Sequence, residues 1–282
     1  MTKPNDPSKL ARLDIQCPLV ESLLVRFLKS EAGKFGFSRA VLGLSGGIDS
    51  AVSASLAARA FGPKSVLAVL MPYKSSNAAS ERDAREVATK LGIETRKIDI
   101  SPMVDGYIEK NDVADRIRRG NVMARARMIV LYDLSAEGKS LVIGTSNKSE
   151  ILLGYSTQFG DAASALNPLG DLYKHQVYQL ARHLDLPRSV IDKAPSADLF
   201  EGQTDESELG FTYAEVDRLL ELMVDQRYSQ AELVKAGFPL AFVHKVARRL
   251  LVNQYKRLPP VIAKLSERTI NHDFRYLRSW GH

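Results

Sequence analysis

The chain has 282 residues, a formal net charge of +6 and a sequence pI of about 9.3. Its single cysteine, Cys17, excludes a disulfide framework, a paired-cysteine redox centre and a cysteine-based zinc site. The apolar runs are too short to span a bilayer, and the first residues lack the apolar stretch of a secretory signal, so we expect a cytoplasmic protein without a membrane partner. The basic charge suits either nucleic acid or a phosphate-rich small substrate.

Strand and helix patterns alternate over the first half of the chain. The predicted strands are Ala40–Leu44, Ser65–Met71, Glu94–Ile100 and Ser140–Gly144. The predicted helices are Pro18–Lys34, Ile48–Phe61, Ser80–Leu91 and Val113–Glu137. This alternation predicts an α/β fold with a doubly wound parallel sheet, which binds ligands beyond the carboxyl ends of its strands.

The second half of the chain is predicted to be mainly helical. The predicted helices are Tyr173–His183, Tyr213–Val224, Ser229–Lys235 and Pro239–Arg257. The polar segments Pro72–Ser80 and Ser196–Gly210 are predicted to be loops that order over a ligand, although Thr204 and Ser207 are also candidate helix caps. Because the chain has no repeat or linker, we expect one domain, 1–282, with a helical C-terminal part at 211–282.

The stretch Ser-Gly-Gly-Ile-Asp-Ser at 45–50 joins the first predicted strand to the helix that follows. The first amides of a helix have no intrahelical acceptor and lie at the positive end of its dipole, so this turn is a site for an anion such as phosphate. Gly46 and Gly47 allow the backbone to curl around the anion, and Ser45 and Ser50 add hydroxyl donors. Asp49 would repel a phosphate unless a cation lay between them, which suggests Mg²⁺. The spacing matches neither GxxxxGK[ST] nor GxGxxG.

This loop resembles the pyrophosphate loop of the ATP pyrophosphatases, which split ATP between its α and β phosphates. Four more segments follow in order: GNVMARARMIVLYDLS, LVIGTSNKSEILLGYSTQFGD, LNPLGDLYKHQVYQLAR and KAPSADLFEGQTDESELG. Together they resemble the ammonia-dependent NAD synthetases over about residues 17–257. The resemblance implies a Rossmann-like fold of the adenine nucleotide alpha hydrolase type. It also implies a homodimer, for which the predicted helix Val113–Glu137 is a plausible interface.

The reaction implied by the resemblance has two steps. The carboxylate of deamido-NAD attacks the α-phosphate of ATP, with Mg²⁺ as cofactor, to give an acyl adenylate and pyrophosphate. Ammonia then displaces AMP and leaves NAD. Since the chain has no glutaminase nucleophile or domain, we expect ammonia rather than glutamine as the nitrogen donor. An ATP pyrophosphatase that amidates another acid is the alternative, whereas a nucleic-acid module would explain the pI but not the ordered motifs.

The family's functional residues map onto this chain position by position. The resemblance implies ATP contacts from Gly43, Leu44, Ser45, Gly46, Gly47, Ile48, Asp49, Ser50, Thr145, Lys174 and Ser196. It implies metal ligation by Asp49 and Glu150, and catalytic roles for Asp49, Lys174 and Asp161, the last in handling ammonia. It implies a deamido-NAD site at Arg125, Gln158, Ala165, Tyr255 and Lys256. We expect Asp49 and Lys174 to lie in a surface crevice, where truncation spares the core.

Some of these residues have ordinary structural interpretations. Arg125 could be a solvated or interface residue of its helix, Glu150 could interact with a helix dipole, and Lys174 could simply begin a helix. The chain also departs from the family pattern on the deamido-NAD side, with Gln158, Ala165 and Tyr255 where Lys, Asp and His are usual. Because one cation and one anion are lost together, we predict local repacking, with NAD still the product and a raised Michaelis constant for deamido-NAD.

Overall fold

The computed structural model describes residues 12–196, 200 and 204–270. Four parallel strands form a sheet in the order β3-β2-β1-β4, with Leu42 opposite Ala68 and Val41 opposite Val142. The strands are β1 (Ala40–Gly43), β2 (Val66–Leu70), β3 (Glu94–Lys97) and β4 (Leu141–Val142). The predicted α/β class and parallel sheet are confirmed, and each strand ends earlier than its apolar run predicted.

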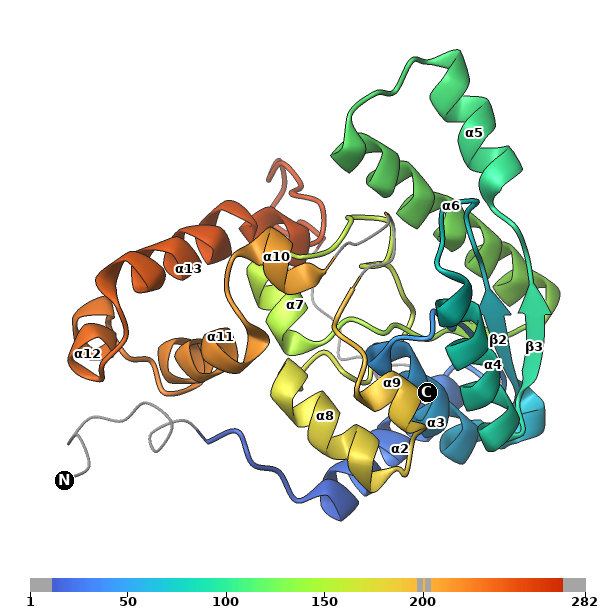
Figure 1. Ribbon diagram of the computed structural model, residues 1–282, viewed down its shortest axis with the longest axis horizontal. Coiled ribbons are helices and arrows are strands. Elements are labelled where there is room, and N and C mark those ends of the chain that lie inside the picture. The colour runs from blue at the N-terminus through green and yellow to red at the C-terminus, as the bar shows by residue number, and fades with distance from the viewer. Residues whose placement is uncertain (1–11, 197–199, 201–203, 271–282) are drawn as a thin grey trace.

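Helices cover both faces of this sheet (Figure 1). One face packs on α2 (Cys17–Gly33), α3 (Ile48–Phe61), α4 (Ala78–Leu91), α8 (Lys174–His183) and α9 (Arg188–Ile191). The other packs on α5 (Ser101–Lys110) and α6 (Arg116–Glu137). Alternate side chains of β1 enter the two cores, Leu42 on the first side and Val41 on the second. The predicted doubly wound arrangement is therefore confirmed.

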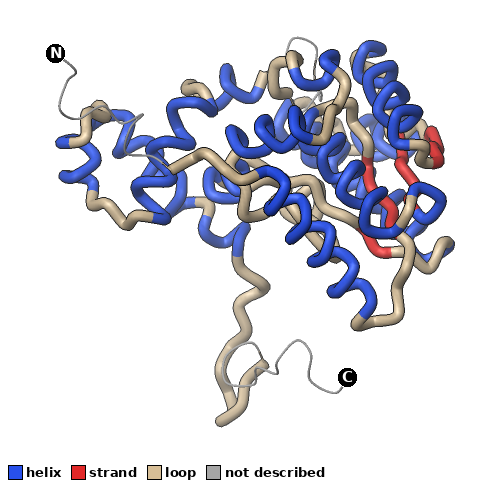
Figure 2. Tube along the Cα trace, turned by 90° about the horizontal axis from the view of Figure 1, so that it is seen from below, coloured by secondary structure: helices blue, strands red, loops and turns tan. Residues whose placement is uncertain are grey.

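The remaining helices build a separate apolar cluster, drawn in orange and red at the left of Figure 1. They are α10 (Asp205–Leu209), α11 (Tyr213–Leu220), α12 (Gln230–Lys235) and α13 (Leu240–Val252), which pack with α7 (Lys148–Leu153). A π-helical turn at Glu221–Asp225 continues α11, and 3₁₀ turns lie at Pro63–Ser65 and Gln254–Arg257. Figure 2 shows that the loop after the Gln254–Arg257 turn extends away from the helices.

Several boundaries differ from the sequence predictions. The helices α5, α7 and α9 were not predicted, and the predicted helix Pro239–Arg257 divides into α13 and the 3₁₀ turn. The predicted loop Ser196–Gly210 contains α10, capped by Thr204, whose hydroxyl accepts from Ser207 N at 3.3 Å as the cap pattern suggested. Residues 197–199 and 201–203 of that loop, and 271–282 of the predicted helical part, lie outside the described residues. Within the described part of the chain, no helix combines the length and apolarity needed to span a membrane.

Candidate active site

The Ser45–Ser50 turn directly follows β1 and opens α3, as the sequence predicted. Gly46 has a φ of +77°, and a Cβ atom there would lie 2.2 Å from the backbone oxygen of Ser80. Only glycine fits this position, because both the backbone conformation and the space exclude a side chain. The loop is thus packed directly against the first turn of α4, which fixes its path.

The two serine hydroxyls of this loop bind the loop itself. Ser50 Oγ donates to Gly47 O at 2.9 Å and accepts from Ser45 N at 3.2 Å, and the Ser45 and Ser50 hydroxyl oxygens are 3.1 Å apart. The first backbone bond at this helix end runs from Ala51 N to Gly47 O, so the amides before Ala51 precede the intrahelical ladder. The backbone N–H of Gly47 also donates to Ser45 Oγ at 3.2 Å, so these contacts fix the path of the loop. The first-turn amides of α3, which lie outside the intrahelical ladder, suit an anion.

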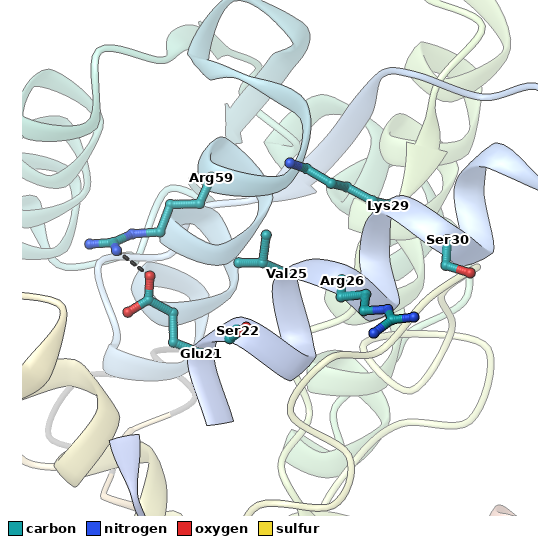
Figure 3. A pocket seen from close by; sticks show the side chains of 7 residues that line it. All are labelled: Glu21, Ser22, Val25, Arg26, Lys29, Ser30 and Arg59. Atoms are coloured by element: carbon teal, nitrogen blue, oxygen red, sulfur yellow. Dashed lines mark hydrogen bonds and ion pairs between the residues drawn. The ribbon is translucent and has the colours of Figure 1, made fainter. Parts of the chain in front are cut away.

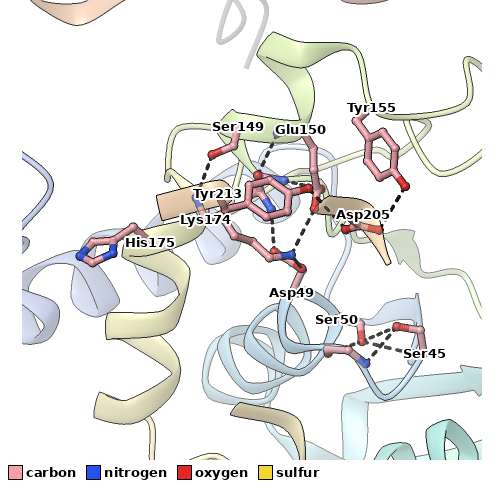
Figure 4. A network of polar contacts seen from close by, with 12 residues as sticks. Ser45, Asp49, Ser50, Ser149, Glu150, Tyr155, Lys174, His175, Asp205 and Tyr213 are labelled. Carbon is pink, nitrogen blue, oxygen red and sulfur yellow. Dashed lines mark hydrogen bonds and ion pairs between the residues drawn. The ribbon is translucent and has the colours of Figure 1, made fainter. Parts of the chain in front are cut away.

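Lys174 and two carboxylates form a buried charged centre beside this loop (Figure 4). Lys174 Nζ lies 2.5 Å from Asp49 Oδ2 and 3.3 Å from Glu150 Oε1. Asp49 comes from the first turn of α3, Glu150 from α7 and Lys174 from the first residue of α8. Three residues that are far apart in the sequence therefore meet at the carboxyl end of the sheet.

Asn147, which the sequence analysis did not single out, organises both carboxylates. Its side-chain amide donates to Asp49 Oδ1 at 2.8 Å, while its Oδ1 accepts from the backbone N–H of Glu150 at 3.0 Å. Glu150 Oε2 accepts from Asn147 N, completing a capping box at the start of α7. The Asn-x-x-Glu spacing in SNKSE was the available signal for this residue.

The charges of the centre shift one another's pKa values. Burial and the neighbouring Asp49 raise the pKa of Glu150 to about 8. Burial would lower the pKa of Lys174, but Asp49 and Glu150 outweigh that effect and raise it. Asp205 at the start of α10 is also buried, which raises its pKa. A single ammonium thus faces an excess of acidic groups, which favours a further cation in this centre.

The prediction that Lys174 lies in a surface crevice is wrong, because only 3% of its side chain is exposed, against 16% for Asp49. Truncating Lys174 would leave two largely buried carboxylates without their counter-charge, so we no longer expect the fold to be unaffected.

A second group of predicted residues gathers around residues 154–161, which follow α7. Arg125 Nε on α6 donates to the backbone oxygen of Gln158 at 3.2 Å. Lys256 Nζ donates to the backbone oxygens of Gly154 and Ser156, both at 2.7 Å. Two predicted deamido-NAD contacts therefore hold one segment from opposite sides through its backbone.

The other predicted residues are placed as follows. Asp161 is exposed, and its Oδ1 accepts from Thr157 N at 2.8 Å. Ala165 and Tyr255 are also exposed, Tyr255 to 58%. Thr145 lies between β4 and α7, at the same edge of the sheet as the glycine loop. Ser196 follows Pro195. The carbonyl of Pro195 accepts from the backbone N–H of Asp205, so the residue before Ser196 lies next to the start of α10.

Lys193 is a further residue to which no role was assigned. Its Nζ lies 2.9 Å from Asp83 Oδ2, 3.0 Å from Ser80 Oγ and 3.4 Å from the backbone oxygen of Gly46. It links the glycine loop and α4 to the chain that leads into Ser196.

The groove of about 660 Å³ in Figure 3 lies elsewhere, on α2 and the far end of α3. Six of its seven lining residues have polar or charged side chains, and they include the ion pair between Arg59 and Glu21. Because Asp49 stands at the other end of α3, this groove is not part of the charged centre.

A family model described as NAD synthase matches residues 20–260. The chain belongs to the NAD synthase family. Within this family, the chain is 56% identical over 272 residues to the NH(3)-dependent NAD(+) synthetase of Trichlorobacter lovleyi, covering 96% of this chain and 100% of the relative. The resemblance carried by the five ordered motifs is confirmed at the level of the NAD synthase family.

Solved structures agree with this family assignment. The NMN synthetase from Francisella tularensis superposes with a TM-score of 0.79 at 34% identity, over 89% of this chain and 99% of that chain. The NH3-dependent NAD synthetase from Campylobacter jejuni in complex with the nitrate ion gives a TM-score of 0.77 at 35% identity, over 89% and 100%.

Proposed function

We propose that this NAD synthase family member is an ATP-dependent ligase that amidates deamido-NAD with ammonia, producing NAD, AMP and pyrophosphate. The observation that carries the proposal is the centre of Lys174, Asp49 and Glu150 beside a glycine loop that opens α3. It occurs in a chain that is 56% identical to a full-length NH(3)-dependent NAD(+) synthetase. The diverged ligase for another acid has no comparable support.

In the first step, the loop from Gly43 to Ser50 would bind the β and γ phosphates through the backbone amides of α3. Lys174 at the start of α8 would stabilise charge that develops on the α-phosphate as the nicotinate carboxylate attacks. Thr145 and Ser196 would contact the rest of ATP from either side of the loop. The Ser45–Ser50 turn follows β1 and Thr145 follows β4, so this part of the proposed site is at the carboxyl ends of strands, where doubly wound sheets bind nucleotides.

Mg²⁺ fits the carboxylate pair of this centre. Asp49 and Glu150 supply the hard oxygen ligands that the ion prefers. Burial and the neighbouring Asp49 raise the pKa of Glu150, and a bound cation would favour the ionised form of both carboxylates. Asp49 and Glu150 would hold the ion, which would supply neutralising charge for the phosphates when bound.

The second substrate would bind at the 154–161 segment. Arg125 and Lys256 would supply positive charge beside this segment, and Gln158 within it, Ala165 after it in the chain and Tyr255 before Lys256 would complete the site. Asp161 would orient ammonia or accept its proton as the amide forms, a role that an exposed carboxylate at the end of this segment can serve. The two half-sites lie at opposite ends of the short helix α7.

We further propose a cytoplasmic homodimer in which the chain acts as one unit, with the helical part at 211–282 attached to the sheet domain. The helix α6 presents Ile117, Ile129 and Tyr132 with 74%, 60% and 45% of their surfaces exposed. Such a row of apolar side chains suits burial against a second copy.

The deciding experiment is turnover by the purified chain with ATP, Mg²⁺, ammonium and deamido-NAD, with products separated by chromatography. We expect NAD, AMP and pyrophosphate in equal amounts. A parallel reaction with deamido-NMN tests the smaller acid suggested by the likeness to an NMN synthetase. Amidation of deamido-NMN alone would overturn the dinucleotide substrate, and absence of any pyrophosphate release would overturn the ligase.

A further inference from the structure

A carboxylate outside the charged centre lies completely buried behind it. Asp217 on α11 is 0% exposed. Its Oδ1 accepts from the hydroxyl of Ser149 at 2.5 Å, and its Oδ2 accepts from the backbone N–H of His175 at 2.8 Å. Asp217 thereby joins the C-terminal helical cluster to the first turns of both α7 and α8.

These contacts cap α8 from outside. The residue before the helix, Tyr173, provides no side-chain cap for the first-turn amides. Instead, the N–H of Lys174 donates to Ser149 Oγ at 2.9 Å and the N–H of His175 donates to Asp217. A carboxylate at this end of a helix is also favoured by the helix dipole. The two amides that define the direction of Lys174 are therefore held by Asp217, one directly and one through Ser149.

The position of Lys174 depends on this cap, because its backbone begins α8 while its ammonium reaches Asp49 and Glu150. Figure 4 shows Ser149 and Lys174 adjoining the carboxylate centre. We propose that Asp217 is a positioning residue, which aims the Lys174 ammonium at the reacting phosphates through Ser149 and the first turn of α8. This inference rests on the proposed function, since it specifies how the same site is organised.

Other contacts also attach the helical cluster to α7 and the start of α8. Lys148 on α7 pairs with Asp225 at 2.8 Å, and the Tyr173 hydroxyl donates to the same carboxylate at 3.0 Å. Apolar packing of Leu153 and Tyr173 joins the same elements. A buried carboxylate is costly to keep, and burial raises the pKa of Asp217 to about 6. Its hydrogen bonds from Ser149 and from the backbone N–H of His175 indicate that Asp217 orients the start of α8 in addition to attaching the helical cluster.

The matched variants are Asp217→Asn and, as control, Asp225→Asn, which removes a carboxylate that links the same elements without contacting the Lys174 or His175 amides. We expect Asp217→Asn to lower kcat for pyrophosphate release about 100-fold, as small misplacements of catalytic groups do, with KM for ATP changed less than about threefold. Asp225→Asn should lower stability but retain kcat per folded molecule. Equal kcat losses in the two variants would overturn the proposal.

Ser149→Ala keeps the test decisive should Asp217→Asn fail to fold. It removes only the relay to the Lys174 amide, and we expect kcat to fall about tenfold as one net hydrogen bond is lost. Combining either variant with Lys174→Arg should give much less than the product of the single effects, because both act on one ammonium. Independent, multiplying effects would contradict a positioning role.

Amide hydrogen exchange separates failure of this inference from failure of the proposed function. If the wild-type chain releases no pyrophosphate, the function fails, whereas exchange still reports the cap. We expect the amides of Lys174 and His175 to lose at least about tenfold protection in Asp217→Asn but not in Asp225→Asn. Unchanged protection at both amides in Asp217→Asn would overturn the inference in either case.

Discussion

The charged centre and the 154–161 segment use positive side chains in opposite ways. Lys174 is buried and pairs with two carboxylate side chains that come from different helices. Arg125 and Lys256 instead donate to backbone oxygens of the segment. A side-chain network depends on the identity of each member, whereas a backbone carbonyl is present whatever residue stands there.

This difference bears on the predicted departure at Gln158. Gln158 contributes its backbone oxygen to Arg125, so the side chain at this position can change without breaking that bond. Removing Lys174 would leave both Asp49 and Glu150 without their counter-charge, and removing either carboxylate would take away one of the two partners of Lys174. We therefore expect the proposed ATP site to tolerate fewer single substitutions than the proposed deamido-NAD site.

The largest effect should come from breaking the charged centre with Lys174→Met. We expect pyrophosphate release to fall at least about 1,000-fold, as when a charge-stabilising group is removed from a transition state. The unpaired carboxylates should also lower the free energy of unfolding by about 3–5 kcal/mol in metal-free buffer. Lys148→Met, which removes two partly exposed ion pairs, with Asp171 and Asp225, is the control. Wild-type stability in Lys174→Met would show that the centre is not charge-coupled.

The glycine loop should be nearly as sensitive, but at only one of its two glycines. Gly46→Ala places a Cβ 2.2 Å from Ser80 O at a φ of +77°, so the loop must shift. We expect about a 100-fold loss of pyrophosphate release from this misplacement. In Gly47→Ala the nearest contact of the new Cβ is the side-chain oxygen of Ser45 at 3.3 Å, which has to shift by only a few tenths of an ångström, so the loss should be smaller. Steady-state assays of both variants decide the order.

On the other half-site, Lys256→Met should weaken deamido-NAD selectively. Losing a charge-assisted contact should raise KM for deamido-NAD roughly 10- to 100-fold, with KM for ATP unchanged. Lys245→Met is the control, because Lys245 also donates to a backbone oxygen, that of Gly210. A rise in KM for ATP equal to that for deamido-NAD would contradict the proposal that Lys256 acts only on deamido-NAD.

The pH dependence of stability provides a test of the buried Asp217. Its folded pKa of about 6 exceeds the ordinary value of 3.8, so the folded state keeps the proton to higher pH than the unfolded state. Its contribution to stability is complete below pH 3.8 and is lost as the pH rises to about 6, amounting to up to about 3 kcal/mol. Denaturant titrations should show a shallower decline over this window in Asp217→Asn. Parallel curves for wild type and variant would contradict a raised pKa.

The smallest effects should come from the side chain of residue 158. Gln158→Ala should leave KM for deamido-NAD within about threefold, because the contact to Arg125 uses the backbone. Gln158→Lys, alone or with Ala165→Asp, should lower that KM by up to about tenfold through a regained charge-assisted bond. Initial rates against deamido-NAD concentration measure both. A large loss in Gln158→Ala would place its side chain in the site and contradict the repacking interpretation.

The sequence was sufficient for the sheet, the long helices and the glycine loop. Ala40–Gly43 and Ile48–Phe61 have a strong apolar pattern. The adjacent glycines Gly46 and Gly47 between them indicated a tight turn from strand to helix. The resemblance of the ordered motifs to the family then identified Asp49, Glu150 and Lys174 as candidate site residues. Short helices such as α7 and α10 were missed because five or six residues show no clear periodicity, and such helices form through caps and tertiary contacts.

Only the tertiary structure showed how these residues depend on one another. Lys174 stands 125 residues from Asp49 and 24 from Glu150. Sequence spacing therefore could not show that Lys174 pairs with these two carboxylates, or that it is buried and not in a surface crevice. Asn147 and Asp217 acquire their roles from the partners that α3, α8 and α11 bring to them. Local sequence determines which segments become helix or strand, whereas the exposure and charge of a side chain depend on neighbours that only packing supplies.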